Sequence, residues 1–164
     1  LIHKWVNMPY SSRFWQMQGS MEALYEYYQK QEKEHITSTF LVCHNEQPVA
    51  LFDVYQAIWT VVRTCYNAQN NDYGIHLLLA PPRQLADLQK QDNEISKNIL
   101  QTIIEMLFSF MSVERIVAEP DHQNHNAHRL AERVGFEYQF DVSLIEKKAR
   151  FYIITKSRFK ALHP

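Results

Sequence analysis

The segment spanning residues 115–136, RIVAEPDHQNHNAHRLAERVGF, constrains the fold of this chain more than any other. It begins as a short apolar run at residues 116–118, which is typical of a buried strand. Pro120 then ends the regular structure, because it has no amide hydrogen to donate and biases the residue before it away from helical angles. Helical spacing resumes in four apolar residues ahead of Gly135: Ala127, Leu130, Ala131 and Val134. The segment therefore predicts a strand, a polar turn, a helix and the start of another strand.

Length and composition favour one globular domain over residues 1–164. A chain of 164 residues can bury a sizeable core, and a hydrophobic content of 46% is far above that of disordered proteins. The formal net charge of −1 argues against nucleic acid or an anionic membrane as the main partner. No apolar run approaches the roughly 20 residues that cross a bilayer. We therefore expect a cytoplasmic protein.

The periodicity of apolar residues predicts the order of the remaining elements. Helices are predicted in two parts within residues 1–35 and over residues 95–111, with the helix of the segment above. Strands are predicted over residues 37–44, 49–62, 74–80, 116–118, 136–144 and 149–156. Residues 83–94 are polar and predict an irregular or weakly helical connection. This order indicates a mixed α/β fold with helices packed on a sheet.

Two polar residues stand out in this pattern. His76 lies in a strand that otherwise consists of Ile75 and three leucines, where a histidine is costly unless it has a partner or a function. Asp121 follows the next predicted strand of the sheet. Taken singly, His76 could be a hydrogen-bonded core histidine, and Asp121 could cap a turn or a helix.

The chain resembles the acyl-CoA-dependent N-acyltransferase superfamily (GNAT), in which a strand, a polar turn with an Asn and a helix ending in Gly-Phe form half of the acyl-CoA site. Three segments carry the resemblance: HKWVNMPYSSRFWQ near the start, GIHLL at residues 74–78, and AEPD followed three residues later by Asn124. In this order they are similar to the branch that acylates hydroxylamines during hydroxamate siderophore synthesis. The resemblance covers nearly the whole chain and implies a mixed, mainly antiparallel sheet flanked by helices. The family's usual first strand is expected to be missing, which would leave a sheet edge open.

The resemblance implies that His76 and Asp121 are the catalytic pair. His76 would be the general base or a relay, and Asp121 would orient it or contact the substrate nitrogen. A hydroxylamine nitrogen is much less basic than an alkylamine and is neutral at physiological pH, so a modest base suffices. Neither Cys43 nor Cys65 lies in a nucleophile-like motif. We therefore expect direct transfer from the thioester within a ternary complex.

Binding of acetyl-CoA or another short acyl-CoA is where the chain departs from its relatives. The family cradles the pyrophosphate with a Gly-rich loop at a helix N-terminus, whereas residues 81–100, PPRQLADLQKQDNEISKNIL, contain no glycine. Ser96 could still cap the helix, and Arg83 and Lys97 could contact phosphates. By analogy with the family, pantetheine would lie between two groups of residues: Leu78, Leu79 and Ala80 on one side, and Asn124 and Ala127 on the other.

The acceptor is expected beneath the early aromatic segment. Asn7, Phe14 and Trp15 match the family's pattern near the substrate mouth, although core packing explains the two aromatic residues equally well. Asp53 and Tyr55 share one face of a predicted strand and could meet a cationic amine. Tyr55 could also be an ordinary strand-face aromatic.

Two other groups of polar residues have simple explanations. Lys147 and Arg150 are expected in a solvated turn, from which they could also reach a substrate carboxylate. A further group resembles a metal site: Asp121, His122, His125 and His128, with Glu119 close by. Its spacing fits no common zinc pattern, so we expect no metal, and the three histidines are interpreted as a polar helix face.

The sequence thus predicts an acyl-CoA-dependent N-acyltransferase that acylates a hydroxylated lysine, ornithine or diamine in siderophore biosynthesis. The alternative is a non-catalytic acyltransferase-like module that serves as a docking domain for a larger synthetase. A third interpretation, still within the enzyme class, is transfer to an ordinary acceptor such as an antibiotic amine or a protein N-terminus. The open sheet edge would also allow a homodimer.

Overall fold

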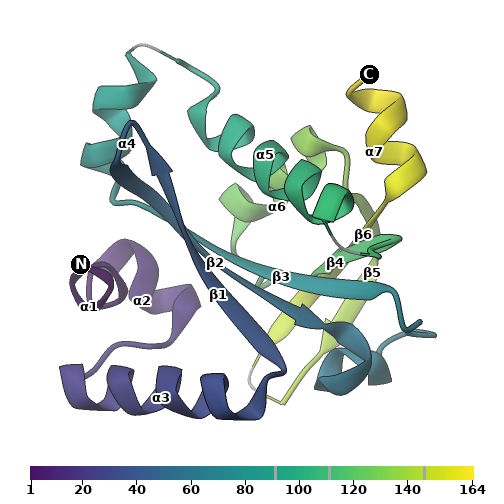
Figure 1. Cartoon of the computed structure of the whole chain (residues 1–164), viewed down its shortest axis with the longest axis horizontal. Helices are drawn as coiled ribbons and strands as arrows, with labels where there is room; N and C mark the ends of the chain where they lie inside the picture. Colours follow the sequence, from purple (N-terminus) through teal and green to yellow (C-terminus); the bar gives the residue numbers. More distant parts are fainter. Residues whose placement is uncertain (91, 111, 146) are drawn as a thin grey trace. The chain divides into compact units, whose positions relative to one another are not determined.

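The structure is a computed structural model that describes residues 1–90, 92–110, 112–145 and 147–164. The first part of the chain contains α1 (Ile2–Val6), α2 (Pro9–Trp15), α3 (Met21–Glu34), β1 (Thr37–His44), β2 (Gln47–Gln56), two 3₁₀ turns η1 (Ala57–Trp59) and η2 (Val61–Thr64), and β3 (Asp72–Leu79). The second part contains α4 (Pro82–Gln89), α5 (Ile95–Phe110), β4 (Arg115–Ala118), α6 (His125–Val134), β5 (Glu137–Ser143), β6 (Lys148–Thr155) and α7 (Lys156–Leu162) (Figure 1). The predicted mixed α/β class is confirmed.

Two elements differ from the prediction. β2 ends at Gln56, and the apolar run that follows forms 3₁₀ turns instead of continuing the strand to residue 62. An apolar run of this length does not distinguish a strand from other buried structure, and here Trp59 and Val61 are exposed. α7 was not predicted, although Thr155 caps it by accepting a hydrogen bond from the Arg158 amide at 3.1 Å.

The strands form one six-stranded sheet in the order β1-β2-β3-β4-β6-β5. β3 and β4 are parallel, whereas β6 is antiparallel to both β4 and β5. The β5–β6 pair confirms the predicted terminal strand pair, and β1 lies at one edge of the sheet (Figure 1).

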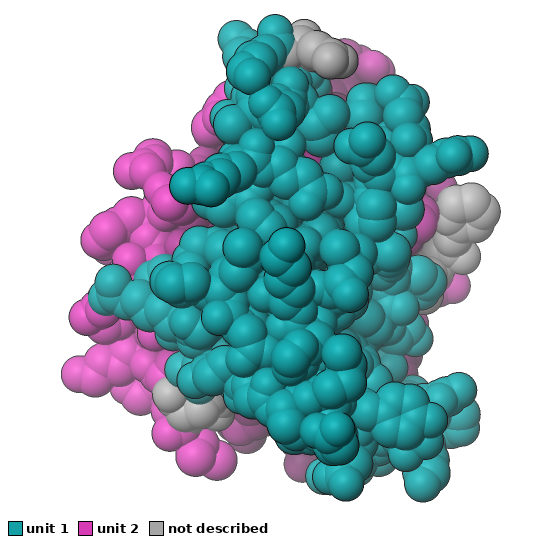
Figure 2. All heavy atoms as spheres, turned by 90° about the vertical axis from the view of Figure 1, so that its left-hand side faces the viewer, with its two compact units in different colours: residues 1–54, 76–95 teal, residues 55–75, 96–164 magenta. Residues whose placement is uncertain are grey.

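The chain divides into two compact units (Figure 2). Unit 1 comprises residues 1–54 and 76–95, and unit 2 comprises residues 55–75 and 96–164, so β2 and β3 contribute to both. In unit 2, one face of α5 is buried as predicted: Ile99, Leu100, Ile103, Ile104 and Leu107. The Phe110 side chain and Met111, which the same prediction included, lie outside the described residues.

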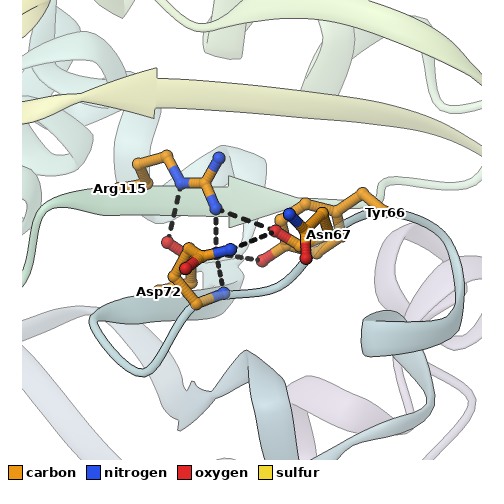
Figure 3. Close-up of polar contacts among 5 residues, drawn as sticks. Tyr66, Asn67, Asp72 and Arg115 are labelled. Atoms are coloured by element: carbon orange, nitrogen blue, oxygen red, sulfur yellow. Dashed lines mark hydrogen bonds and ion pairs between the residues drawn. The ribbon is translucent and has the colours of Figure 1, made fainter.

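A buried ion pair fixes the beginnings of β3 and β4 in unit 2 (Figure 3). The Asp72 side chain is fully buried and accepts hydrogen bonds from Arg115 Nε at 2.7 Å and from Arg115 Nη2 at 2.6 Å. The Tyr66 hydroxyl and the Gln69 amide also donate to this carboxylate, at 2.9 and 2.8 Å. Arg115 Nη2 also donates to the Asn67 carbonyl at 3.1 Å. Four donors therefore compensate the desolvation of one carboxylate.

Candidate active site

The register of β2 against β3 brings Asp53 opposite His76. The Ala80 amide donates to the Val49 carbonyl at 2.8 Å, which fixes one end of the pairing. At the other end, a Cβ added at Gly74 would collide with the Tyr55 ring, so these two residues also face each other. Both anchors fit a single antiparallel register without a bulge, and in that register Asp53 is the partner of His76. Directly opposed residues point to the same face of a sheet.

The buried Asp53 carboxylate is held from the neighbouring strand as well. The Thr39 hydroxyl on β1 donates to Asp53 Oδ1 at 2.6 Å, while the Asp53 side chain is only 2% exposed. Burial raises the pKa of Asp53 above its ordinary value, and the Thr39 hydrogen bond and the positive charge of a protonated His76 oppose this shift. Thr39, Asp53 and His76 therefore form a row across three adjacent strands.

His76 is exposed, so the interpretation of it as a core histidine is wrong. Around it on the strand, Ile75 and Leu78 are buried and Leu77 is half-buried. The Trp15 ring meets the imidazole edge-on, with ring centroids 6.4 Å apart. The strand thus presents one titratable group at the surface of unit 1, next to an aromatic ring and coupled to a buried carboxylate.

Two buried donors in this part of unit 1 lack acceptors. Within the described residues, Trp15 Nε1 and the Tyr28 hydroxyl are buried and have no hydrogen-bond partner. The Asp53 charge acts on Tyr28 and on its neighbour Tyr27, adding to the effect of burial, and the pKa of Tyr27 is raised to about 12. Buried donors without acceptors are rare in folded proteins and call for an explanation. Tyr28 was not among the residues selected from the sequence, because a tyrosine at helical spacing usually packs in a core.

The other two residues of the early segment have local partners. The Asn7 side chain donates to the His3 carbonyl at 2.8 Å and accepts from the Gly19 amide at 3.0 Å. It therefore ties the end of α1 to the loop ahead of α3. Phe14 is half-buried and lies under the Arg13 guanidinium, 5.1 Å from the ring centroid.

Tyr55 belongs to a buried polar group of unit 2. Its hydroxyl donates to Glu119 Oε2 at 2.9 Å, and its ring packs in an apolar cluster with Val117 and Phe151. Lys147 Nζ lies 3.9 Å from Glu119, and the Lys147 side chain is largely buried. The prediction of a solvated Lys147 is therefore wrong, because Glu119 is a buried carboxylate that requires a counter-charge. Arg150 is half-buried, beside Asp141 and the Tyr138 ring.

Asp121 organises the turn that leads into α6. Its carboxylate accepts from the Gln123 amide at 2.8 Å, and its carbonyl accepts from the Asn124 amide at 2.8 Å. Asp121 also forms a bridge with Ala149 on the strand side. The alternative interpretation of Asp121 as a residue that caps a turn is confirmed, and its catalytic role stays a prediction. The Asp121 side chain remains partly exposed.

α6 begins and ends as predicted. Asn124 Oδ1 accepts from the Ala127 amide at 3.2 Å, and Gly135 ends the helix at a φ of 109°, where glycine is favoured. His128 departs from the predicted polar face: it is buried and stacks on Tyr152, with ring centroids 5.7 Å apart. Burial lowers the pKa of His128, and its Nδ1 has no partner among the described residues.

The glycine-free segment forms α4 and a turn whose polar groups hydrogen-bond to one another. Asp92 Oδ1 accepts from the Glu94 amide at 2.9 Å, and the Asp92 carbonyl accepts from the Ile95 amide at 3.2 Å. Ser96 is the second residue of α5, so the expected capping role of Ser96 is wrong. Arg83 is exposed on α4, whereas Lys97 is half-buried on α5. The carboxylate of Asp92 thus lies in the turn directly ahead of α5.

Leu78 and Ala80 are buried in unit 1, Leu79 is half-buried, and the Leu79 carbonyl accepts from the Tyr10 hydroxyl at 2.9 Å. Ala127 is half-buried on α6.

A separate hollow in unit 2 involves none of the candidate site residues: it is lined by Gln69, Asn70, Asn71, Asp72, Glu114 and Arg115. Among the described residues, no group of three or more His, Cys, Asp or Glu side chains could hold a metal ion. Over the same residues, no helix is both long and apolar enough to cross a bilayer.

A family model described as an acetyltransferase (GNAT) domain matches residues 1–144. The chain belongs to the GNAT acetyltransferase family. This GNAT chain is 23% identical over 157 residues to the N(6)-hydroxylysine O-acetyltransferase of Escherichia coli, covering 95% of itself and 48% of that protein. It is 22% identical over 163 residues to the N-hydroxyputrescine acetyltransferase of Acinetobacter baumannii, covering 97% of itself and 73% of that protein. The chain therefore spans about half the length of the first of these relatives.

The GNAT fold is also seen in solved structures. Aminoglycoside acetyltransferase AAC(6')-Ib in complex with coenzyme A superposes with a TM-score of 0.86 at 21% identity, covering 99% of this chain and 92% of that one. Spermidine N-acetyltransferase from Vibrio cholerae, in complex with CoA and spermine, gives a TM-score of 0.70 at 14% identity over 97% of this chain and 90% of that one. The predicted mixed GNAT-like architecture is confirmed.

Proposed function

We propose that this GNAT domain is an acyl-CoA-dependent N-acyltransferase that acylates a hydroxylamine in hydroxamate siderophore biosynthesis. The acceptor would be N-hydroxylysine, N-hydroxyornithine or an N-hydroxydiamine, and acetyl-CoA or another short acyl-CoA would be the donor. The observation that carries the proposal is the exposed imidazole of His76, in a strand where Ile75 and Leu78 are buried and Leu77 is half-buried. The two relatives named for hydroxylated amines support this acceptor class.

The reaction needs one proton acceptor on the protein. The hydroxylamine nitrogen would attack the thioester carbonyl, forming a C–N bond while the C–S bond breaks. His76 would take the proton that the nitrogen loses, and the leaving thiolate of CoA would take up a proton to become the free thiol. Asp121, whose carboxylate is partly exposed, is proposed as a partner of this step, either orienting the base or contacting the substrate nitrogen.

Residues selected from the sequence are proposed as contacts for each substrate. For acyl-CoA we propose the main chain of Leu78, Leu79 and Ala80 beside pantetheine, with Asn124 and Ala127 as further contacts and Arg83, Lys97 and Ser96 near the phosphates. For the acceptor, Trp15 is the strongest candidate, because its buried Nε1 lacks an acceptor among the described residues. Asn7 and Tyr55 are weaker candidates, since their polar groups already have partners.

The experiment has a binding arm and a turnover arm. Acetyl-CoA and succinyl-CoA are titrated calorimetrically into the purified chain, and thiol release is then followed with N-hydroxylysine, N-hydroxyornithine and N-hydroxyputrescine. Thiol release that requires a hydroxylamine supports the proposal. Binding of neither thioester and no thiol release would reject it in favour of the docking module, while transfer only to ordinary amines would reject the acceptor class.

Product chemistry then separates acylation of nitrogen from acylation of oxygen. An N-acylated product is a hydroxamic acid and gives a coloured ferric complex, whereas an O-acylated hydroxylamine does not. His76→Ala and Asp121→Ala should each lower turnover by about 10²-fold or more. His44→Ala is the matched control, because His44 is an exposed histidine at the end of β1 and has no proposed role.

A further inference from the structure

We propose that Asp53, held in place by Thr39, is the carboxylate that positions His76 and supports it as a base. This inference rests on the proposed function, in which His76 accepts the proton. It gives Asp53 a different role from the amine ligand that the sequence indicated. It also adds Thr39, which no feature of the sequence had indicated.

Geometry is the first support. The hydrogen bond between the Ala80 amide and the Val49 carbonyl fixes one end of the β2–β3 register, and the Tyr55 ring over Gly74 fixes the other. Asp53 and His76 lie between these anchors. In such a register, opposed residues have Cβ atoms roughly 4.5–5.5 Å apart, close enough for a carboxylate and an imidazole to interact directly.

The state of the carboxylate is the second support. The Asp53 side chain is almost fully buried, and Oδ1 is already engaged by the Thr39 hydroxyl at 2.6 Å. A flexible amine substrate would have to displace this packing to reach it, whereas His76 approaches from the adjacent strand. Burying a carboxylate is costly unless it has a partner, and an imidazolium opposite is such a partner.

The surrounding groups of unit 1 agree with this assignment. The titratable groups that face Asp53 are His76 on β3 and the hydroxyls of Tyr27 and Tyr28 on α3. Both tyrosines are neutral at physiological pH, since burial and the Asp53 charge raise the pKa of each. An interaction between two charges is mutual, so the effect of His76 on Asp53 implies an equal effect of Asp53 on the His76 imidazolium.

The first test is spectroscopic and needs no substrate. The His76 ring resonance, assigned by its loss in His76→Gln, is titrated by NMR in the wild type, Asp53→Asn and Thr39→Val. We expect the His76 midpoint to fall to lower pH in Asp53→Asn, while that of His44 stays unchanged. An identical His76 midpoint in the wild type and Asp53→Asn would overturn the proposal, whether or not the chain is an acyltransferase.

Kinetics separate a positioning residue from an amine ligand. In Asp53→Asn we expect kcat to fall by about 10- to 100-fold, with little change in the KM of the acceptor. A rise in acceptor KM at unchanged kcat would overturn the proposal and return Asp53 to the substrate site. Thr39→Val should lower kcat less, because it frees the carboxylate without removing it. If no variant or wild type releases thiol, only the proposed function fails, since the NMR titration still decides the pairing.

Asn at position 53 should not unfold the chain. Its side-chain oxygen can still accept the Thr39 hydroxyl, and it carries no charge to bury. Burial raises the pKa of Asp53, so folding disfavours the ionised carboxylate relative to the unfolded chain. Removing the charge therefore stabilises the fold most at a pH where the carboxylate is ionised in both states. We therefore expect Asp53→Asn to be at least as stable as the wild type at pH 7 by urea unfolding. A variant that is more stable yet slower indicates a site carboxylate, whereas one that is less stable would indicate a structural role.

Discussion

Replacing Gly74 by Ala tests the strand register on which the site is built. An ideal Cβ at this position would overlap the ring atoms Cζ and Cε2 and the hydroxyl of Tyr55. Tyr55 is buried, so its ring has little space into which it can move. Overpacking of this kind costs about 1–3 kcal/mol. Moving the ring would also break the 2.9 Å hydrogen bond to the buried Glu119, which costs about 1–3 kcal/mol more.

The expected loss for Gly74→Ala is therefore roughly 2–6 kcal/mol in the free energy of unfolding, measured by urea denaturation at pH 7. A double-mutant cycle identifies the cause. In a Tyr55→Leu background the added methyl group should cost less than about 1.5 kcal/mol, because the shorter side chain leaves the space open. In a Tyr55→Phe background most of the steric cost should remain. An equal cost of Gly74→Ala in all three backgrounds would show that Tyr55 does not lie over Gly74, and the pairing of Asp53 with His76 would lose one anchor.

Three further predictions concern stability and cofactor binding. Asp72→Asn should lower the free energy of unfolding by roughly 2–4 kcal/mol, because Arg115 loses its charged partner, and urea unfolding beside an exposed control such as Asp87→Asn tests this. Burial lowers the pKa of His128 in the folded chain below that in the unfolded chain. As the pH falls through about 6.5, His128 is therefore protonated in the unfolded chain before the folded one, and the free energy of unfolding decreases. His128→Phe should lose less stability between pH 7.5 and pH 5 than the wild type does in thermal unfolding, and equal losses would contradict this account. Asp92→Asn should tighten acetyl-CoA binding about two- to fivefold in calorimetry at low salt, with a smaller gain at high salt, if the start of α5 meets the phosphates. Unchanged affinity would place the phosphates elsewhere.

Much of the fold could be predicted because the signals are local. The α6 helix is bounded by Asn124 and Gly135, whose capping roles depend on residues within one turn. The buried face of α5 follows from a period of 3.6 residues. Local patterns also gave one wrong prediction: the apolar run after Gln56 was expected to continue the strand but forms 3₁₀ turns. They did not predict α7.

The candidate site was predicted only in part. His76, Asp121 and Trp15 were selected from the sequence, and the structure adds Thr39 and Tyr28. The predictions of which polar side chains are buried and which are exposed were the least accurate. His76 is exposed although it follows a buried isoleucine, and His128 is buried although it was expected on a polar helix face. Which side of a strand or helix is covered depends on the elements packed against it, and these come from distant parts of the chain.

The sequence by itself determined the family and the order of most elements, and it supplied His76 and Asp121 as candidates for proton transfer. Only the tertiary structure decided their partners. Asp53 lies opposite His76, and Tyr55 lies over Gly74, because β2 and β3 pair in one particular register. Side chains alternate along a strand with a period of two, so a shift of one residue would turn every one of these groups to the other face. Contacts between residues far apart in the sequence, Val49 with Ala80 and Tyr55 with Gly74, fix that register, and no local pattern in the sequence encodes it.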